Sequence, residues 1–341
     1  MQTQAAGRVT AVTAWDEDAQ EVTVRIEMET RRAINYVALT GPARPGDEVL
    51  LNTTAQVLKL GTGGFDFVSA NLSRALPKSN SLEMGHIIKA RYLPCQMAVL
   101  TLEEQEQYAE VWERDLENLT VLVGQLHSQI APAAAGLFLT GKRKVAYVMT
   151  DAAALPLAFS RLVRDLKSAN LVHHTLTCGQ AFGGDYETVT LHSALLAAKH
   201  VLGCDAVIVC QGPGNAGTGT KYGYSGIEQA HHLDTVKALE GQAVAIVRMS
   251  SADKRERHRG ISHHTRTTLD LAYSRCLVPL PLGADPSGLP PGHAVQFVPN
   301  TQSALDLLAE AGVRVTSMGR GPAEDPLFFH AAAAAGLAKL D

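Results

Sequence analysis

From residue 143 onward, short apolar segments alternate with segments of helical periodicity, and this pattern constrains the fold most. Uninterrupted apolar runs this short are typical of strands in a sheet covered on both faces. The expected strands are 145–149, 171–176, 206–209, 243–247, 276–280, 295–298 and 313–315, and the expected helices are 153–167, 186–202, 225–239, 301–311 and 325–339. The sequence therefore predicts an α/β domain over residues 141–341, with a doubly wound, mostly parallel, Rossmann-like sheet.

The first 75 residues follow a different pattern. Short runs rich in valine and isoleucine are separated by turn formers such as Pro45-Gly46-Asp47. Closely spaced strands of this kind are typical of a small barrel or sandwich. A glycine-rich loop at 60–65 could contact a ligand, but a tight barrel corner is the commoner reason for such glycines. We predict a small β-barrel-like domain at residues 1–75, with strands at 9–12, 21–26, 34–39 and 48–51.

Residues 76–140 are expected to connect the two domains. A long helix fits 103–130, because acidic residues stand early in this segment and four apolar residues follow at helical spacing: Leu116, Leu119, Val123 and Leu126. Pro132 is expected to break the helix.

Composition narrows the class of partner and the location. A net charge of −4 argues against a broad basic face for nucleic acid or an anionic membrane. We find neither an apolar run of about 18 residues nor the apolar core of a signal peptide. The five cysteines show no CxxC spacing, which argues against a zinc ribbon or a disulfide scaffold. We therefore expect a cytoplasmic protein whose partner is a small molecule.

A dense cationic segment follows the expected strand 243–247. Residues 254–266 hold five Lys or Arg and three His. Ser262 is placed to cap a helix that begins at His263 or His264, and cations crowded at a helix N-terminus are best explained by a bound anion. Arg255, Arg257 and Arg259 are the candidate anion ligands, and His258, His263 and His264 are candidates for proton exchange.

Two other interpretations of this segment remain open. It could be a solvated run of charge. His263 and His264 could instead bind a metal, but adjacent helical residues point in different directions and no carboxylate partner is fixed by spacing. We assign no metal ligand.

A glycine-rich loop follows the expected strand 206–209. Its G-x-G-x-x-G pattern begins at Gly212 but follows the third strand rather than the first, and its Lys and Tyr do not fit a Walker phosphate loop. Glycines let backbone N–H groups approach an anion closely, although the loop could also be a flexible surface segment. The candidate ligand-binding residues are Gly212, Gly214, Asn215, Gly217, Thr218, Gly219, Thr220 and Lys221.

Two aspartates follow other expected strands. Asp151 and Asp185 are candidates for a general base, a hydroxyl acceptor or a magnesium ligand, and helix capping is the alternative. Arg320 and Asp325 could join them, although Asp325-Pro326 also fits a helix N-cap. Cys178 keeps covalent catalysis open. Loops that follow parallel strands share one edge of the sheet, so we expect all of them to converge there.

Five segments resemble a catalogued bacterial family, domain of unknown function 3866. They are GDEVLLNTTAQVLKLGTGGFDFV, GHIIKARYLPCQ, GPGNAGTGTKYGYSGIEQ, RERHRGISHHT and MGRGPAEDPLFFHAAAAAG. The resemblance covers essentially the whole chain. It implies a bacterial cytoplasmic protein of this architecture, and it implies no activity, cofactor or catalytic residue.

The sequence favours a protein that binds a phosphorylated or carboxylated small molecule at the carboxyl edge of its sheet. Transferase or hydrolase chemistry fits better than redox chemistry, because the dinucleotide fingerprint is poor. The alternative is a non-catalytic metabolite sensor or assembly protein whose β domain binds a partner or another subunit. Whether the chain is an enzyme, which cofactor it uses and whether it forms a homo-oligomer are left open.

Overall fold

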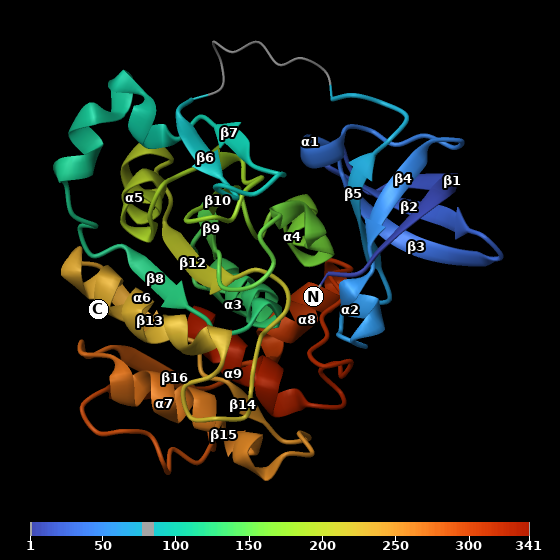
Figure 1. Ribbon diagram of the computed structural model, residues 1–341. Helices are drawn as coiled ribbons and strands as arrows, with labels where there is room; N and C mark the ends of the chain where they lie inside the picture. The colour runs from blue at the N-terminus through green and yellow to red at the C-terminus, as the bar shows by residue number, and fades with distance from the viewer. Residues whose placement is uncertain (1, 77–84, 341) are drawn as a thin grey trace. The chain divides into compact units, whose positions relative to one another are not determined.

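The computed structural model describes residues 2–76 and 85–340, and it divides into two compact units, Met1–Val99 and Leu100–Asp341 (Figure 1). The predicted connecting segment is shared between the units, with residues 85–99 in the first and 100–140 in the second. Residues 77–84, where we placed the start of that segment, lie outside the described residues.

The first unit contains the predicted barrel. Its strands close in the order β1-β2-β3-β5-β4, with β3 and β5 parallel and the other pairs antiparallel. Alternate residues point inward, and mostly valine fills the core, as Val9, Val22 and Val24 illustrate. The strands are β1 (Gln4–Ala14), β2 (Ala19–Ile26), β3 (Glu29–Tyr36), β4 (Glu48–Asn52) and β5 (Asp66–Asn71).

Several elements of this unit were not predicted. The expected strand 34–39 ends at Tyr36, and α1 (Val37–Thr40) follows, because Thr40 donates its hydroxyl to Asn35 and turns the chain. The segment 60–65 turns through Gly63 and Gly64, which have φ of 68° and 84°, before β5 begins. A second short helix and a hairpin complete the unit: α2 (Thr54–Val57), β6 (Ile87–Lys89) and β7 (Met97–Val99).

The second unit is built on an eight-stranded sheet in which every pair of neighbours is parallel, in the order β11-β10-β9-β12-β8-β13-β16-β17. The predicted Rossmann-like class is confirmed. The central strands are entirely buried, as uninterrupted apolar runs require. The bounds are β8 (Thr120–Val123), β9 (Val145–Thr150), β10 (His174–Thr177), β11 (Tyr186–Glu187), β12 (Ala206–Gln211), β13 (Gln242–Ala245), β16 (Leu277–Pro281) and β17 (Ala294–Val298).

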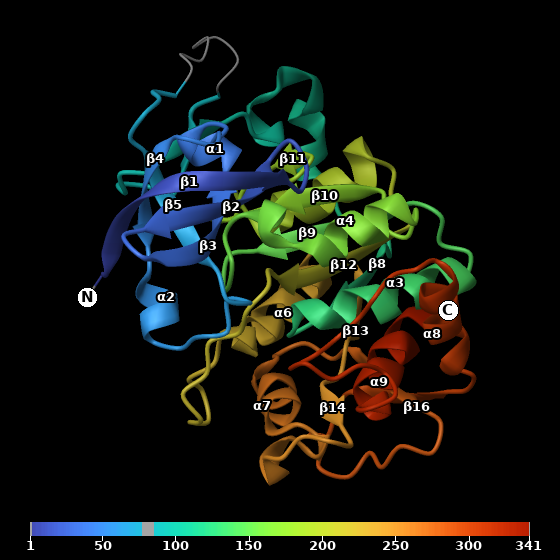
Figure 2. The ribbon, with the colours of Figure 1, turned by 90° about the vertical axis from the view of Figure 1, so that its right-hand side faces the viewer.

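Helices cover both faces of this sheet (Figure 2). Successive strand residues belong alternately to two core clusters: Val207 and Val209 pack with one set of helices, and Ile208 packs with the other. The first set is α5 (Leu191–Leu196), α6 (Gln229–Ala238) and α7 (His263–Leu271). The second set is α3 (Ile130–Leu139), α4 (Arg161–Ser168), α8 (Gln302–Glu310) and α9 (Pro326–Leu337).

The long helix predicted at 103–130 was wrong. This segment forms two 3-10 helices, η1 (Leu102–Glu104) and η2 (Glu106–Glu113), then β8 and η3 (His127–Gln129). β8 lies between β12 and β13 in the sheet, so both of its edges pair with strands that are distant in sequence. Leu116 and Leu119 are buried, but they lie in the turn before β8 rather than on a helix.

Three smaller differences remain. Residues 313–315, expected as a strand, carry no regular structure. The expected helix 186–202 begins with β11, and its last part, η5 (Ala197–Val201), is a π-helix. The helix expected from 153 starts later, at Arg161, after the short η4 (Leu157–Phe159). None of the described helices has the length and apolar character needed to cross a membrane.

Candidate functional site at the carboxyl edge of the sheet

The loops at the carboxyl ends of the strands contact one another in pairs. The Gln180 N–H donates to Asp151 at 2.8 Å, which joins the loops after β10 and β9. The Ala154 N–H donates to the Pro213 carbonyl at 3.1 Å, which joins the loops after β9 and β12. A Cβ built on Gly219 would lie 3.7 Å from an Arg257 nitrogen, which places the glycine-rich loop, 212–226, beside the Arg/His loop, 253–264.

The Arg/His loop leads into α7 through the predicted cap. Ser262 is the N-cap residue of α7, and its hydroxyl accepts the His264 N–H at 3.2 Å. The preceding residues form a two-stranded ribbon, β14 (Met249–Ser250) with β15 (Gly260–Ile261), and a 3-10 turn, η7 (Glu256–His258). This folding brings the turn beside the first residues of the helix.

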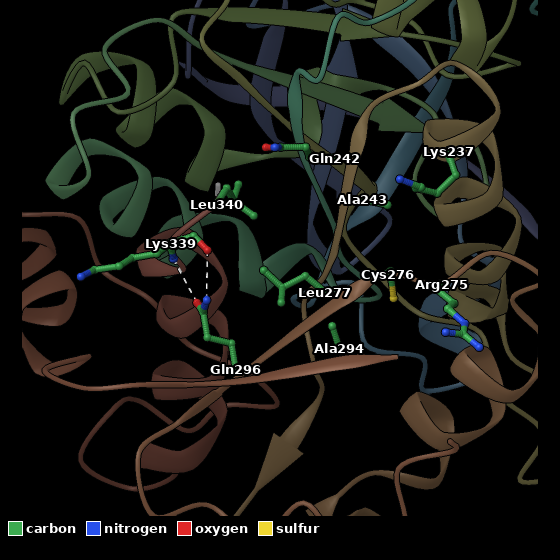
Figure 3. A pocket seen from close by; sticks show the side chains of 10 residues that line it. All are labelled: Lys237, Gln242, Ala243, Arg275, Cys276, Leu277, Ala294, Gln296, Lys339 and Leu340. Carbon is green, nitrogen blue, oxygen red and sulfur yellow. Dashed lines mark hydrogen bonds between the residues drawn. The ribbon is translucent and has the colours of Figure 1, made fainter. Parts of the chain in front are cut away.

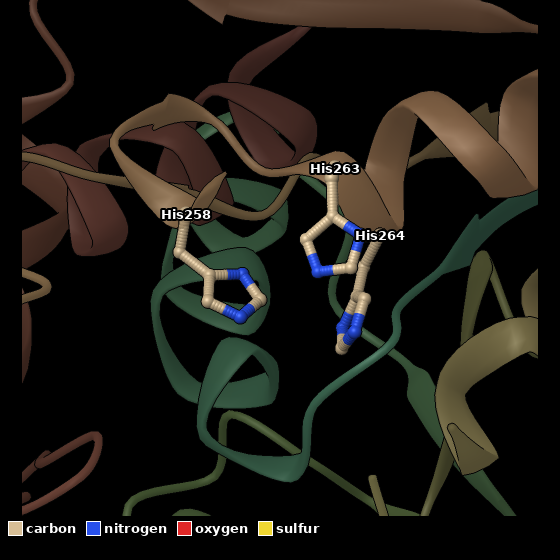
Figure 4. A group of neighbouring side chains, drawn as sticks. All are labelled: His258, His263 and His264. Atoms are coloured by element: carbon tan, nitrogen blue, oxygen red, sulfur yellow. The ribbon is translucent and has the colours of Figure 1, made fainter. Parts of the chain in front are cut away.

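The three histidines of this loop form one cluster. Their ring centroids are 4.8 Å apart for His258–His263, 4.9 Å for His258–His264 and 4.4 Å for His263–His264. Figure 4 shows the three side chains extending from their backbone in the same direction. One potential ligand nitrogen from each lies within 4.8 Å of the others. Adjacent residues of a helix generally point in different directions. At the first turn of α7, however, the rings of His263 and His264 both lie close to His258, which was not predicted.

All three imidazoles are neutral at pH 7. Burial, followed by the positive charge of Arg248, lowers the pKa of His258 to about 3 and that of His264 to about 2. Burial and the neighbouring Arg257 lower the pKa of His263. The rings therefore offer lone pairs or neutral N–H donors, and they are weak bases for proton exchange.

Arg248 and Tyr224 hold the His264 ring, and the sequence analysis singled out neither. The buried Arg248 guanidinium lies 2.9 Å from Nδ1 of His264. Because a guanidinium can only donate, Nδ1 accepts and the proton of the neutral ring is on Nε2. The Tyr224 ring stacks on His264 at 3.6 Å with an interplanar angle of 2°. Only the position of Arg248, just after a strand, could have suggested its role.

One carboxylate at the centre of the loop faces three arginines. Asp253 accepts from Nε and Nη2 of Arg255 at 3.0 and 2.8 Å, and its Oδ2 lies 3.9 Å from both Arg248 and Arg320. The Arg255 contact, despite opposing burial, holds the pKa of Asp253 far below its usual range. Arg255 is thus engaged within the protein and is less free to bind a ligand than the sequence suggested.

Asp325 supplies the second carboxylate of this network. It accepts from the Ser250 hydroxyl at 2.6 Å, from the Ser251 N–H at 2.8 Å and from Arg320 at 3.3 Å. Pro326 is the first residue of α9, as predicted, but the Asp325 side chain does not cap that helix. Through its hydrogen bonds to Ser250 and Ser251, the Asp325 side chain connects the end of β14 to the segment before α9.

The remaining predicted anion ligands differ in their availability. Arg259 donates to the Asp253 carbonyl at 3.1 Å. The Arg257 guanidinium is exposed and has no partner among the residues that the structure describes. Lys221 is exposed and lies 5.0 Å from the Tyr222 ring centroid. Arg257 is therefore the cation of this loop best placed to reach a ligand.

The glycine-rich loop is folded on itself. The Thr218 hydroxyl donates to the Gly223 carbonyl at 3.1 Å, and the Gly223 N–H donates to Thr220 at 3.1 Å. Asn215 accepts from Ser225 and from Gln211, both at 3.1 Å. These polar side chains order the loop, and its tip near Gly219 remains beside Arg257.

The two predicted aspartates take different positions. Asp151 follows β9 and holds the turn after β10 through Gln180, so it lies at the expected edge. Asp185 does not, because the chain doubles back after β10 to form β11. Its carboxylate accepts from the Thr175 N–H at 2.9 Å and pairs with Lys167 at 2.5 Å, near the start of β10. Asp185 is a structural partner of β10.

A glutamate that sequence reasoning missed lies at the same edge. Glu228, from η6 (Ser225–Glu228), accepts from the Thr150 hydroxyl at 2.6 Å at the end of β9. Burial, with a further contribution from Asp151, raises the pKa of Glu228 to about 7. The nearby His232 is neutral, because burial lowers its pKa to about 3, and its Nδ1 is buried without a partner in the described residues. No motif in the sequence marks Glu228.

A hollow of about 360 Å³ lies at the opposite edge of the sheet, where β13, β16 and β17 begin (Figure 3). Its lining includes Lys237, Arg275 and Cys276. Burial raises the pKa of Cys276 to about 12, so this thiol is not a nucleophile at neutral pH. None of the predicted site residues lines this hollow.

Comparison with known proteins identifies the family without an activity. No curated protein matches the chain. A family described as a protein of unknown function, DUF3866, matches residues 32–336, which include the barrel from the middle of β3 onward, the glycine-rich loop and the Arg/His loop. The match spans most of both units, and the chain therefore belongs to the domain of unknown function 3866 family.

Proposed function

We propose that the carboxyl edge of the sheet binds a small phosphorylated or carboxylated molecule between the glycine-rich loop and the Arg/His loop. The excess of cations around Asp253 carries the proposal. Three guanidinium groups lie within 4.0 Å of this one carboxylate, one of them buried, and Arg257 adds a fourth cation nearby. Burial, followed by the positive charge of neighbouring arginines, lowers the pKa of Arg248 to about 10. A bound anion relieves this repulsion.

Two further features support an anion at this position. The exposed Arg257 lies beside Gly219, where backbone N–H groups can approach a ligand without a side chain in the way. The N-terminus of α7 begins in the same loop, and its dipole favours negative charge. A phosphate or carboxylate group would interact favourably with Arg257 and with the N-terminus of α7 at the same time.

Transfer or hydrolysis of a group on this molecule is the reaction that we propose. Glu228 lies at the same edge with a pKa near neutrality, as an acid or base at pH 7 requires. The alternative is a non-catalytic metabolite sensor. It is favoured by the contacts of the two aspartates, because Asp151 accepts from a backbone N–H, and Asp185 accepts from a backbone N–H and from Lys167, rather than from a histidine. Turnover of a panel of phosphate monoesters and carboxylate esters separates the two functions.

Calorimetric titration with inorganic phosphate tests the binding site. Loss of one charge-assisted hydrogen bond costs about 1.5–3 kcal/mol, so Arg257→Ala should weaken phosphate binding about 10-fold or more. Arg275→Ala is the matched control, because this exposed arginine stands at the opposite edge of the sheet. The control should bind phosphate as the unaltered protein does. Equal affinities for all three proteins contradict the proposal.

A further inference from the structure

The histidine cluster has the composition of a transition-metal centre. Neutral imidazole is a ligand for zinc, cobalt, nickel, copper and iron. Three protein ligands are the usual number in catalytic zinc sites, where the remaining position takes water or substrate. His258, His263 and His264 supply three such groups from a stretch of seven residues, with one nitrogen from each inside a 4.8 Å span. In a tetrahedral zinc site, neighbouring ligand nitrogens are about 3.4 Å apart, so the rings must move closer together than they are here to bind a metal.

The individual nitrogens are suited to this role. Nε2 of His263 is buried and has no hydrogen-bond partner among the described residues, which is costly for a polar atom unless something binds it. Nδ1 of His258 lies 2.7 Å from the Ser262 hydroxyl, which leaves its Nε2 as the free nitrogen. This is the outer-shell contact that orients a metal-bound histidine.

His264 sets a condition on metal binding. Its Nδ1 accepts from Arg248, so the proton on Nε2 blocks that atom as a ligand. A metal must therefore bind Nδ1 in place of the guanidinium. Arg248 has an alternative partner, because its Nη2 lies 3.9 Å from the Asp253 carboxylate. Metal binding is then coupled to a turn of Arg248 towards Asp253.

We propose that His258, His263 and His264 bind one divalent transition-metal ion, of the zinc or cobalt class, with at least one coordination position open. An anion held by the Arg/His loop would complete the coordination. That last step rests on the proposed function, whereas binding of the metal itself does not.

Titration of the chelator-treated full chain with Co²⁺ in phosphate-free buffer tests the metal site. We expect one equivalent of cobalt and visible absorption bands of a low-coordinate site. His263→Ala should weaken cobalt binding at least about 10-fold, since even the loss of an outer-shell partner has an effect of that size. The control is His231→Ala, an exposed histidine in α6. Circular dichroism establishes that each variant is folded.

Arg257→Ala provides a second test, with opposite effects on the two ligands. Removing this exposed positive charge near His263 should tighten cobalt binding and weaken phosphate binding. Folded protein that takes up no stoichiometric cobalt, or equal cobalt affinity for His263→Ala and His231→Ala, overturns the metal site.

The two proposals fail in different ways. Phosphate binding without cobalt binding supports the proposed function and contradicts the metal inference. Cobalt binding without phosphate binding supports the metal centre and contradicts the proposed function.

Discussion

Replacing Asp253 with asparagine should destabilise the second unit more than an ordinary substitution of a charged residue. The carboxylate and the Arg248 guanidinium are 5% and 8% exposed, so the change leaves a buried cation without its counter-charge. Removing one partner of a buried ion pair costs about 3–5 kcal/mol. The 3.9 Å separation places this pair at the lower end of that range.

The other two arginines add little to this cost. Arg255 is 41% exposed and Arg320 is 26% exposed, so water screens both once Asp253 is neutral. An exposed ion pair contributes about 0–1 kcal/mol. We therefore expect Asp253→Asn to lower the free energy of unfolding by about 3 kcal/mol at pH 7.

The loss should depend on pH in a defined direction. The pKa of Asp253 is lowered in the folded protein, chiefly by Arg255. Its contribution is therefore fully present above the unfolded pKa of about 3.9, and it is lost as the pH falls through the folded pKa. The difference between the unaltered protein and Asp253→Asn should shrink on acidification below about pH 4.

Urea unfolding followed by circular dichroism measures both effects. Asp306→Asn is the control, because the side chain of this exposed aspartate in α8 is hydrogen-bonded only to Gln302 among the described residues. Its effect should stay within about 0.5 kcal/mol, as is usual at the surface. If Asp253→Asn is no more destabilising than this control at pH 7, the charge network around Asp253 is not buried in the way that we describe.

Two further substitutions test the surroundings of the site and the packing of the unit. Burial raises the pKa of Glu228 from 4.5 to about 7. The unaltered protein should therefore lose on the order of 3 kcal/mol of stability relative to Glu228→Gln as the pH rises from 5 to 8. If the stabilities of the two proteins, measured by urea unfolding, change in parallel over this range, that expectation is wrong. Gly336→Ala should destabilise the second unit by about 1–3 kcal/mol, since a Cβ on this residue of α9 would overlap the Ala133 carbonyl of α3. An unchanged melting temperature would contradict this close contact between the two helices.

The fold was predictable where local pattern and tertiary environment agree. The apolar runs at 145–149 and 206–209 became β9 and β12, because uninterrupted burial needs neighbours on both faces. β8 was missed, because Leu116, Leu119, Val123 and Leu126 also match a helical period. A short apolar run does not distinguish the two structures. Its strand conformation is fixed by pairing with β12 and β13, more than 80 residues away in sequence.

The site was predictable in its parts but not in its arrangement. Charge density marked the Arg/His loop, and the cap at Ser262 followed from residue type. Which cations stay free depends on tertiary contacts: Arg255 pairs with Asp253, whereas Arg257 does not. The predicted position of Asp185 was wrong, because no pattern in the sequence indicates that the chain turns back to form β11. Glu228 owes its raised pKa to burial against β9, which local sequence does not encode.

A crystal structure of the protein grown with phosphate tests the central claim most directly. We predict a phosphate ion between the tip of the glycine-rich loop and the Arg/His loop, within hydrogen-bonding distance of the Arg257 guanidinium and beside Gly219. Phosphate bound only elsewhere, such as among Lys237, Arg275 and Lys339 at the opposite edge of the sheet, would contradict it.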